Sequence, residues 1–265
     1  MKTKYDVVFV VLVYRNTRDL IDFFTSNEVD NSHTIVVNSF FDNDTETVFK
    51  NIAIQNNADF ISVPNKGYGF GNNRGVEYAI AHYSFNYLII SNADIIIKKF
   101  DKEVLQRYNN SIIAPKIVSA NGKNQNPCSP YNPFRLESYL RYIVYRDRHK
   151  KLIWIFFIWS RIKKILFHLI YPMKNRIFAA HGAFVIFPYN VIKSLFPLYN
   201  EEMFLFNEEA HLGQLAQKKK METVYVPQII ISHKEDGSMK IASIDVFEKE
   251  RQSYIEYYNR WYKNG

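Results

Sequence analysis

The sequence has very little cysteine, and it lacks a long uncharged hydrophobic run. Cys128 is the single cysteine among 265 residues, which excludes a disulfide framework within the chain and a cysteine-rich zinc site. This cysteine usage fits a reducing compartment. The apolar stretch near the start, residues 7–13, is too short for the hydrophobic region of a secretion signal with its cleavage site. The sequence also has no internal repeat and no low-complexity tract.

What is present is an ordinary globular composition with an uneven distribution of charge. Hydrophobic residues make up 47% and charged residues 23%, and the length allows one large α/β domain or two small ones. The net charge is +8, and 11 basic residues with only two acidic ones lie between Arg135 and Arg176. The rest of the chain is nearly balanced. We therefore expect one localised anionic partner rather than a general nucleic-acid-binding surface.

Short apolar runs alternate with helical patterns along the first part of the chain. Strands are predicted at residues 7–13, 34–37, 59–63 and 87–91, since each run is apolar and bounded by turn residues. Such alternation indicates βαβ units and a parallel sheet. Further along we predict strands at 95–97, 112–118, 183–187, 224–226 and 229–231, helices at 74–83, 191–196, 204–219 and within 244–262, and a loop at 120–133.

The segment Ile90-Ser91-Asn92-Ala93-Asp94 carries the strongest chemical signal. It ends a buried strand, so it delivers the Asp94 carboxylate at the carboxyl end of that strand, where ligands bind in open α/β sheets. A strand-end Asp can also simply cap a turn or a helix. A glycine- and asparagine-rich segment upstream and a pair of acids downstream favour a catalytic or metal-binding role.

The upstream segment, Asn65–Gly75, contains four glycines. We predict a loop over residues 65–73 that opens a helix at Arg74. Glycine lets backbone N–H groups approach a ligand closely, and a helix N-terminus favours phosphate. The segment is neither a Walker loop nor a dinucleotide fingerprint. The alternative is a turn-rich connector without a ligand.

The acids downstream are Glu208 and Glu209, which stand with His211 at a predicted helix start. A carboxylate among aromatic residues has a raised pKa and can act as a general base. The alternative is that the two acids only complement the helix dipole. His233 follows an apolar run and is a candidate metal ligand, although a histidine in this position is often a plain surface residue. His181 is a similar, weaker candidate.

The basic segment contains an apolar and aromatic stretch at residues 152–171. A membrane-spanning helix needs about 20 mostly apolar residues, but Arg161, Lys163, Lys164 and His168 interrupt this one. An interfacial amphipathic helix is predicted instead, with anionic lipid and a lipid-linked acceptor as partners. The alternative is a solvated basic helix whose aromatic residues pack on the core.

Together these segments resemble the family 2 inverting glycosyltransferases, in particular the rhamnosyltransferase-like branch that builds bacterial surface polysaccharides such as capsule and O-antigen. The most specific match is Asn65–Gly75, which is similar to the family's Asn-x-Gly to Gly-Asn-Asn-x-Gly nucleotide-binding stretch. The other matches are the opening strand and sugar-nucleotide loop at Val11–Asn16, the metal motif at Asn92-Ala93-Asp94, the acceptor-side strand at Gly182–Val185, the acidic segment at Phe204–Glu209, and the closing strand from Val226 through His233 to Ser238.

The resemblance implies an α/β fold, namely a single Rossmann-like nucleotide-diphospho-sugar transferase domain of the GT-A type over residues 1–265. Its central sheet would be mostly parallel and flanked by helices, with a basic aromatic helical insertion at 135–176. Residues 1–118 would bind the nucleotide sugar. Residues 119–243 would bind the acceptor, and residues 244–265 would form a C-terminal helix.

The resemblance also implies transfer of rhamnose or a hexose from a dTDP- or UDP-sugar to a lipid-linked polysaccharide, by direct displacement with inversion. Asp94 and His233 would hold Mg²⁺ or Mn²⁺ at the diphosphate, and Glu209 would be the general base beside Glu208. The enzyme would work on the cytoplasmic face of the bacterial inner membrane as a peripheral protein, with no nucleic-acid partner. The implied substrate-binding residues are Val13, Tyr14, Asn16, Asn38, Asn65, Gly67, Asn72, Asn73, Asn92, His181, Gly182 and His211.

Some positions depart from the family's pattern, and two other classes of protein stay open. Asn38 stands where the family usually has an Asp that reads the base, Glu209 replaces an Asp, and His211 replaces a later acid. A sugar-nucleotide pyrophosphorylase would also use a parallel sheet and a strand-end Asp, but its usual glycine-rich loop with a basic residue is absent after Val13. A non-catalytic membrane-associated scaffold is the other alternative, and the retained acids argue against it.

Overall fold

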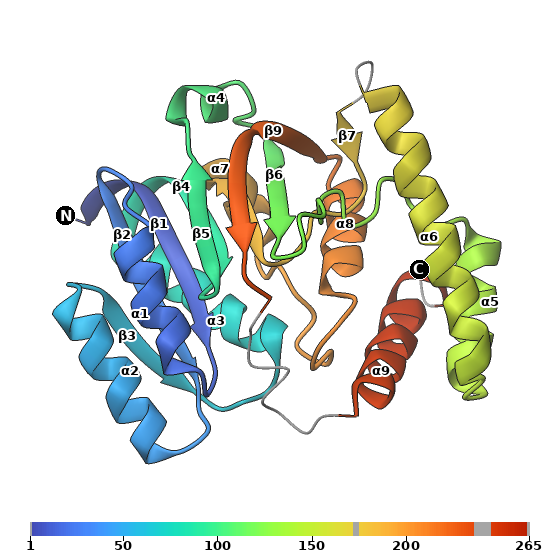
Figure 1. The fold of residues 1–265 in the computed structure, drawn as a ribbon, viewed down its shortest axis with the longest axis horizontal. Helices are drawn as coiled ribbons and strands as arrows, with labels where there is room; N and C mark the ends of the chain where they lie inside the picture. The colour runs from blue at the N-terminus through green and yellow to red at the C-terminus, as the bar shows by residue number, and fades with distance from the viewer. Residues whose placement is uncertain (1, 172–174, 236–244, 264–265) are drawn as a thin grey trace.

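Among the described residues, the strands between Thr3 and His233 form one nine-stranded sheet (Figure 1). The computed structural model describes residues 2–171, 175–235 and 245–263. The strand order is β3-β2-β1-β4-β8-β6-β9-β5, and β7 pairs with β9 beside this path. The strands are β1 (Thr3–Val13), β2 (Ser32–Ser39), β3 (Asp59–Val63), β4 (Tyr83–Asn92), β5 (Ile95–Lys99), β6 (Ser111–Ser119), β7 (Arg176–Ile177), β8 (Phe184–Pro188) and β9 (Glu222–His233).

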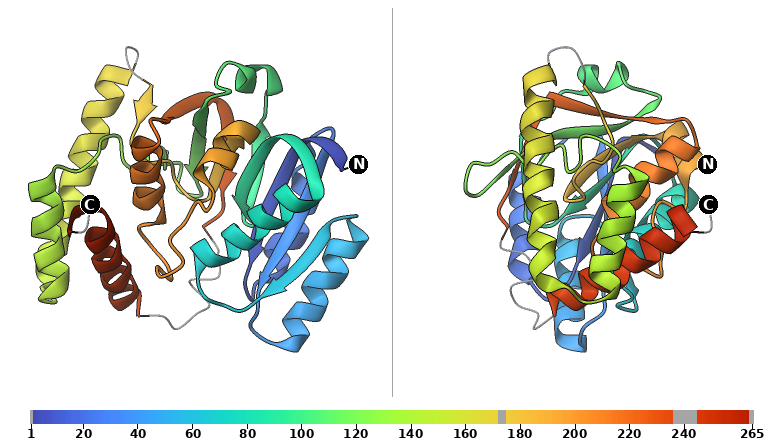
Figure 2. Two further views of the ribbon diagram at one scale, coloured as in Figure 1. Left: turned by 180° about the vertical axis from the view of Figure 1, so that it is seen from behind. Right: turned by 90° about the vertical axis from the view of Figure 1, so that its right-hand side faces the viewer.

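Helices cover both faces of the sheet, because successive side chains of a strand point to opposite sides. Val7, Phe9 and Val11 of β1 pack with residues of α1, α2 and α4, whereas Val8 and Val10 pack with residues of α3, α7 and α8 (Figures 1 and 2). The helices are α1 (Thr17–Ser26), α2 (Asn43–Gln55), α3 (Tyr68–His82), α4 (Lys102–Gln106), α5 (Arg135–Arg146), α6 (Lys150–Ile170), α7 (Tyr189–Leu195), α8 (Glu208–Lys218) and α9 (Val246–Tyr258), and a π-helical turn follows at Asn259–Lys263.

The predicted parallel sheet is confirmed for the first four strands, and the rest of the sheet is mixed. β1 pairs in parallel with β2 and β4, and β2 with β3. β8 runs antiparallel to β4 and β6, and β9 runs antiparallel to β5 and β7 but parallel to β6. Parallel pairing needs a long crossover. Helices α1, α2 and α3 provide that crossover between the first strands, whereas β8 enters from the opposite end after the helical insertion.

The glycine-rich segment is mostly helix, so the loop predicted at residues 65–73 was wrong. Helix α3 begins at Tyr68. A Cβ added to Gly71 would lie 2.4 Å from the Cδ1 atom of Leu12, and one added to Gly75 would lie 2.3 Å from a valine methyl of β1. The glycines are therefore needed because α3 packs directly on the sheet, a use of glycine that the same residue pattern allows.

The basic insertion folds into α5 and α6, which stand with α9 at the end of the molecule farthest from β3 (Figure 1). Tyr145, Ile153, Tyr254 and Tyr257 are buried together between these helices. Within the described ranges, no helix is both long and apolar enough to cross a membrane. The end of the predicted C-terminal helix, the predicted family position Ser238 and residues 172–174 of the insertion lie outside the described residues.

Candidate functional site

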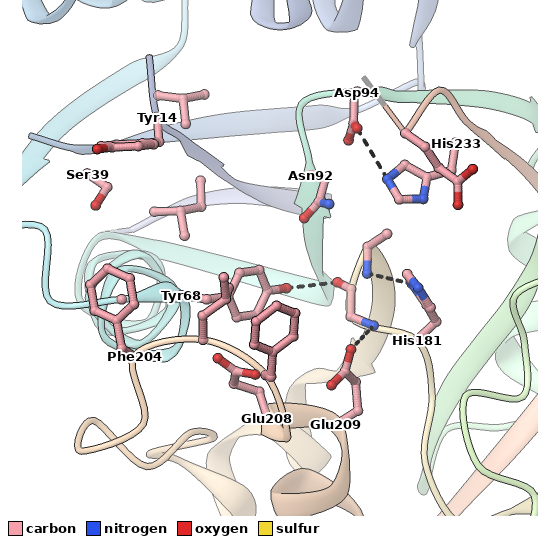
Figure 3. Close-up of a pocket in the computed structure, with 18 of the residues that line it drawn as sticks. Tyr14, Ser39, Tyr68, Asn92, Asp94, His181, Phe204, Glu208, Glu209 and His233 are labelled. Atoms are coloured by element: carbon pink, nitrogen blue, oxygen red, sulfur yellow. Dashed lines mark hydrogen bonds and ion pairs between the residues drawn. The ribbon is translucent and has the colours of Figure 1, made fainter. Parts of the chain in front are cut away.

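A cavity of about 640 Å³ opens where the carboxyl ends of β1, β4 and β9 meet the start of α8 (Figure 3). Parallel strands end at the same edge of a sheet, so residues that are distant in sequence converge there. Most of the residues predicted for the site line this cavity. They are Val13, Tyr14, Asn65, Gly67, Asn92, Asp94, His181, Gly182, Glu208, Glu209 and His233.

Three other predicted substrate-binding residues do not line the cavity and instead bond within the protein. Asn16 caps α1. Asn38 donates to the hydroxyl of Ser62 on the next strand at 3.0 Å. His211 is buried and accepts from the indole N–H of Trp261 at 3.1 Å, while its removal from water lowers its pKa to about 4. These bonds support a structural role for the three residues, and their substrate contacts stay a prediction.

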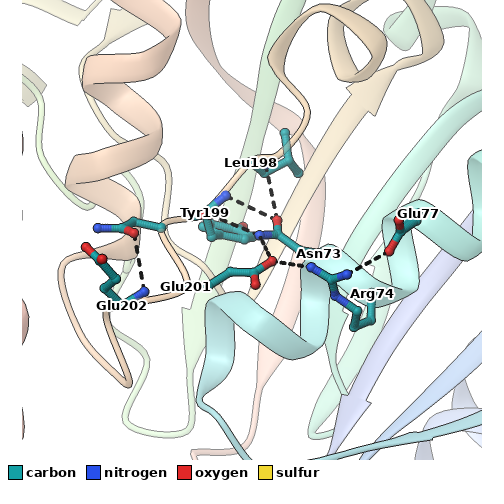
Figure 4. Close-up of polar contacts among 8 residues, drawn as sticks. Asn73, Arg74, Glu77, Leu198, Tyr199, Glu201 and Glu202 are labelled. Atoms are coloured by element: carbon teal, nitrogen blue, oxygen red, sulfur yellow. Dashed lines mark hydrogen bonds and ion pairs between the residues drawn. The ribbon is translucent and has the colours of Figure 1, made fainter.

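Asn73 also does not line the cavity, and it joins α3 to the chain that leads into α8 (Figure 4). Its Oδ1 accepts from the backbone N–H groups of Leu198 and Tyr199 at 3.1 and 3.2 Å, and its Nδ2 donates to the Tyr199 carbonyl at 2.9 Å. Glu201 accepts from the same amide and pairs with Arg74. The predicted nucleotide-binding asparagine is thus a buried clamp between two segments.

We expect Asn73→Ala to lower the free energy of unfolding by roughly 3 kcal/mol, because each buried N–H or C=O group left unpaired costs about 1–3 kcal/mol. Urea denaturation measures the change. Asn72→Ala is the matched control, since Asn72 is equally buried but donates only to the Tyr68 carbonyl of its own helix, at 3.0 Å. Equal losses in the two variants would contradict the clamp.

One corner of the cavity is built by Asp94 and His233. The Lys234 N–H donates to the Asp94 carbonyl at 3.0 Å, which holds the two strand ends together, and His233 Nε2 lies 3.2 Å from Asp94 Oδ2. Gln125 Oε1 lies 2.8 Å from His233 Nδ1, and Gln125 Nε2 donates to Glu235 at 2.7 Å. A carboxylate only accepts, so Glu235 turns the amide oxygen of Gln125 towards His233. Nδ1 therefore carries a proton, and Nε2 is the atom that faces Asp94.

This corner fits a divalent cation. A neutral His233 would point its Nε2 lone pair at the Asp94 carboxylate, so a proton or a cation is needed between the two atoms. Adjacent ligands in an octahedral site at about 2.1 Å lie about 3.0 Å apart, close to the observed 3.2 Å. Among the described residues no group of three or more His, Cys, Asp or Glu side chains gathers to hold a metal. The remaining ligands of such a cation would come from outside the protein.

The opposite corner is built by Glu208 and Glu209 at the start of α8. Phe206 and Asn207 adopt left-handed backbone conformations, with φ of 75° and 67°. Such positive φ angles are uncommon in residues other than glycine. These two residues turn the chain, so α8 begins at Glu208. The predicted start at residue 204 was wrong. The turn places both adjacent carboxylates at the cavity (Figure 3).

One hydrogen bond positions the Glu209 carboxylate, and a second holds the residue that donates it. The Gly182 N–H donates to Glu209 Oε1 at 3.4 Å, and the Tyr68 hydroxyl donates to the Gly182 carbonyl at 2.8 Å. Gly67 closes the wall behind them, since a Cβ there would lie 2.2 Å from the carbonyl oxygen of Phe204. The glycine-rich segment therefore reaches the acidic corner through Gly67 and Tyr68.

The two carboxylates differ in their hold on a proton. Burial and the charge of Glu209 raise the pKa of Glu208 well above its usual range, and Glu208 Oε1 has no hydrogen-bond partner among the described residues. Burial also raises the pKa of Glu209, but the Gly182 amide and the positive charge of Lys164 oppose the rise. The pKa of Glu208 is therefore the higher of the two, and Glu209 is the group that ionises more easily. Loss of water lowers the pKa of His181 to about 3, so this imidazole is neutral.

The cavity also contains residues that the sequence did not reveal. Ser39 directly follows the predicted Asn38, so the end of the second strand could have pointed to it. Tyr68 lies within the glycine-rich segment, in which the glycines and asparagines carry the recognisable pattern. Gln125 lies in a long loop, and Lys249 lies on α9. No local sequence signal links those last two residues to the site.

Comparison with known proteins adds the fold. No protein family matches the sequence, and no curated protein matches it significantly. GalNAc-T7, crystallised with UDP, GalNAc and Mn²⁺, is similar in structure with a TM-score of 0.57 at 11% identity, over 88% of this chain and 44% of that chain. TarS of S. aureus is similar with a TM-score of 0.53 at 11% identity, over 96% of this chain and 43% of that chain. The chain thus spans under half the length of either neighbour, and its fold is that of the GT-A glycosyltransferases.

Proposed function

We propose that the protein transfers a sugar from a nucleotide diphosphate sugar to a saccharide acceptor, with inversion at the anomeric carbon. One observation carries the proposal. A single cavity at the strand ends of a GT-A fold has a cation-type corner at Asp94 and His233 and a base-type corner at Glu209. The neighbour GalNAc-T7 was crystallised with UDP and Mn²⁺, which supports a UDP- or dTDP-linked donor here.

We assign the donor end of the cavity to residues 1–118, together with His233 from the end of β9. Asp94 and His233 would hold Mg²⁺ or Mn²⁺, which when bound would offset the negative charge of the departing diphosphate. Tyr14 and Ser39 line the cavity at the ends of β1 and β2, where the nucleoside would lie. The ring of Tyr14 packs edge-on against Phe41 at 5.8 Å, so its orientation is supported from behind.

We assign the acceptor end to residues 119–243. Glu209 takes the proton of the acceptor hydroxyl as the oxygen of that hydroxyl bonds to the anomeric carbon. The bond from that carbon to the diphosphate breaks on the opposite face, which inverts the centre. Glu208, which keeps its proton, donates a hydrogen bond to an acceptor oxygen, and this contact would satisfy its unpartnered carboxyl oxygen.

For the substrates, we propose rhamnose or a hexose as the sugar and a growing bacterial surface polysaccharide on a lipid diphosphate as the acceptor. The resemblance of the motifs to the rhamnosyltransferase-like branch supports this assignment. The charge distribution supports an anionic acceptor, because the positive charge of Lys164 on α6 acts on both Glu209 and His181.

A thermal-shift panel tests the donor class. We expect either UDP or dTDP with Mn²⁺ to raise the melting temperature, since a ligand that binds only the folded state at 100 times its Kd stabilises the protein by about 2.7 kcal/mol. For a chain of this length the shift would be roughly 5–10 °C. GDP and CMP serve as comparisons. The same nucleotide without metal should give a smaller shift.

The panel also separates the proposal from its alternatives. A well-folded sample that responds to none of these nucleotides would overturn the proposed function in favour of a non-catalytic scaffold. Formation of a nucleoside triphosphate from a sugar nucleotide and pyrophosphate would instead identify a pyrophosphorylase.

A further inference from the structure

Helix α6 presents a strongly apolar face to solvent. Its inner side packs through Ile153 and Phe167, which are 6% and 1% exposed. On the opposite side Trp154 and Leu169 are 58% and 72% exposed. Large apolar side chains at this helical spacing form one continuous stripe. The solvent-facing side of a surface helix usually carries charged and polar residues instead. The outer face of α6, as we call it, consists of Trp154, Ile155, Ile158, Ile162, Ile165 and Leu169.

The charges around this face have a single sign. The sequence of α6 contains basic residues and no acid. Lys151 and Arg161 are exposed, whereas Lys163 is tied to Glu137 of α5 at 2.8 Å. An apolar stripe with a basic rim is typical of helices that lie in the interface of an anionic membrane.

We propose that the outer face of α6 docks onto the surface of an anionic phospholipid membrane, with the helix axis in the membrane plane. The apolar stripe would enter the boundary between headgroups and acyl chains, and Lys151 and Arg161 would contact the headgroup phosphates. Trp154 suits this depth, because an indole ring is favoured where an apolar and a wet environment meet. A second copy of the chain fits the face less well, since it would bring two basic rims together.

Docking by this face also orients the cavity. The inner side of α6 carries Lys164, whose positive charge acts on Glu209 and on the Cys128 thiol. The helix that rests on the membrane therefore also acts on the charge of the acidic corner, through Lys164. A lipid-linked acceptor could reach this corner from the membrane side. This orientation rests on the proposed function, whereas membrane docking itself does not.

Vesicle co-sedimentation tests the docking. The full chain is expected to bind vesicles of equimolar phosphatidylglycerol and phosphatidylcholine at low salt and to bind phosphatidylcholine vesicles weakly. The triple variant Trp154→Ser, Ile158→Ser, Ile165→Ser should lose binding. Its matched control is Ile21→Ser, Val48→Ser, Ile54→Ser, which removes equally exposed apolar residues from α1 and α2 and should bind like the wild type.

A charge variant gives a second, independent reading. Lys151→Glu with Arg161→Glu should weaken binding to the anionic vesicles by at least about 25-fold, since each basic residue near such a surface contributes roughly fivefold and the new carboxylates are repelled by it. Lys50→Glu with Lys193→Glu changes exposed lysines on α2 and α7 and should have little effect. The emission of Trp154, followed in a variant with Trp159→Phe and Trp261→Phe, should shift to the blue when vesicles are added.

Three results would overturn the docking surface. The first is a wild-type protein that ignores anionic vesicles at low salt, and the second is an outer-face variant that still binds them. The third is a concentration-dependent dimer that the outer-face variant abolishes without vesicle binding, which would make the face an interface between copies. Nucleotide-dependent thermal stabilisation is measured without lipid, so failure of the docking and failure of the proposed function are distinguishable.

Discussion

Asp94→Ala is expected to lower the rate of sugar transfer on the order of a thousandfold, because a metal at a departing phosphate supplies several kcal/mol of transition-state stabilisation. Asp94 is 4% exposed and faces His233 at 3.2 Å, so its loss leaves one protein ligand at the proposed cation site. Initial rates with a radiolabelled sugar nucleotide measure the effect. Titration of Mn²⁺ in the presence of UDP should show a parallel loss of metal affinity.

Asp22→Ala is the matched control for this prediction. Asp22 pairs with Lys234 at 2.6 Å, directly beside His233 in the chain, but it does not line the cavity. Its removal breaks an ion pair near the site without taking away a proposed ligand, and we expect transfer within about twofold of the wild type, since partly exposed pairs contribute little. An Asp94→Ala protein with near-normal transfer and metal binding would rule out the cation site.

Glu209→Gln should have the second large effect, a loss of about 10²–10⁴-fold in transfer rate, which is the usual contribution of general acid–base catalysis. Glutamine keeps the size of the side chain and can still accept from the Gly182 N–H, which lies 3.4 Å from the Glu209 oxygen, but it cannot take a proton from the acceptor. Nucleotide binding at the other corner should be unchanged. A Kd for the donor nucleotide measured beside the rate separates these two effects.

Glu208→Gln decides which of the two acids is the base. Burial and the neighbouring charge raise the pKa of Glu208, which favours its protonated form, and a glutamine amide can donate a hydrogen bond in its place. We therefore expect a loss of no more than about tenfold, the size of one hydrogen bond. If the two variants exchanged these effects, the base would be Glu208.

The pH dependence follows from the same assignment. Glu209 must be ionised to accept a proton, and its pKa is raised by burial. The transfer rate should therefore be full above that pKa and should fall as the pH is lowered through it. In Glu209→Gln the acid limb of the profile should disappear. A limb that persisted in this variant would assign the titration to another group.

Much of the architecture was predictable because it rests on local pattern. The apolar runs of β1 to β4 and the polar residues at their ends are adjacent in sequence, so both the parallel half of the sheet and the position of Asp94 could be derived. The predicted start of α3 was wrong because glycine serves both ligand approach and close helix packing. Only the contacts of Gly71 and Gly75 with β1 distinguish these two uses.

The chemistry at the two corners depended on long-range contacts. The orientation of His233 follows from Gln125 and Glu235, which are 108 and two residues away. The difference between Glu208 and Glu209 follows from the Gly182 amide and from burial, neither of which the order of residues reveals. The same holds for Asn73, whose motif predicted a ligand contact and whose partners are backbone groups 125 and 126 residues away.

The sequence by itself therefore determined the alternating strands and helices, the strand-end carboxylate and the concentration of positive charge in one segment. Hydrophobic periodicity and charge are properties of neighbouring residues, so they can be read without a structure. The tertiary structure alone decided which side of α6 meets solvent, which of the two glutamates has the higher pKa and which asparagines line the cavity. Burial and hydrogen bonding arise only when segments distant in the chain come together.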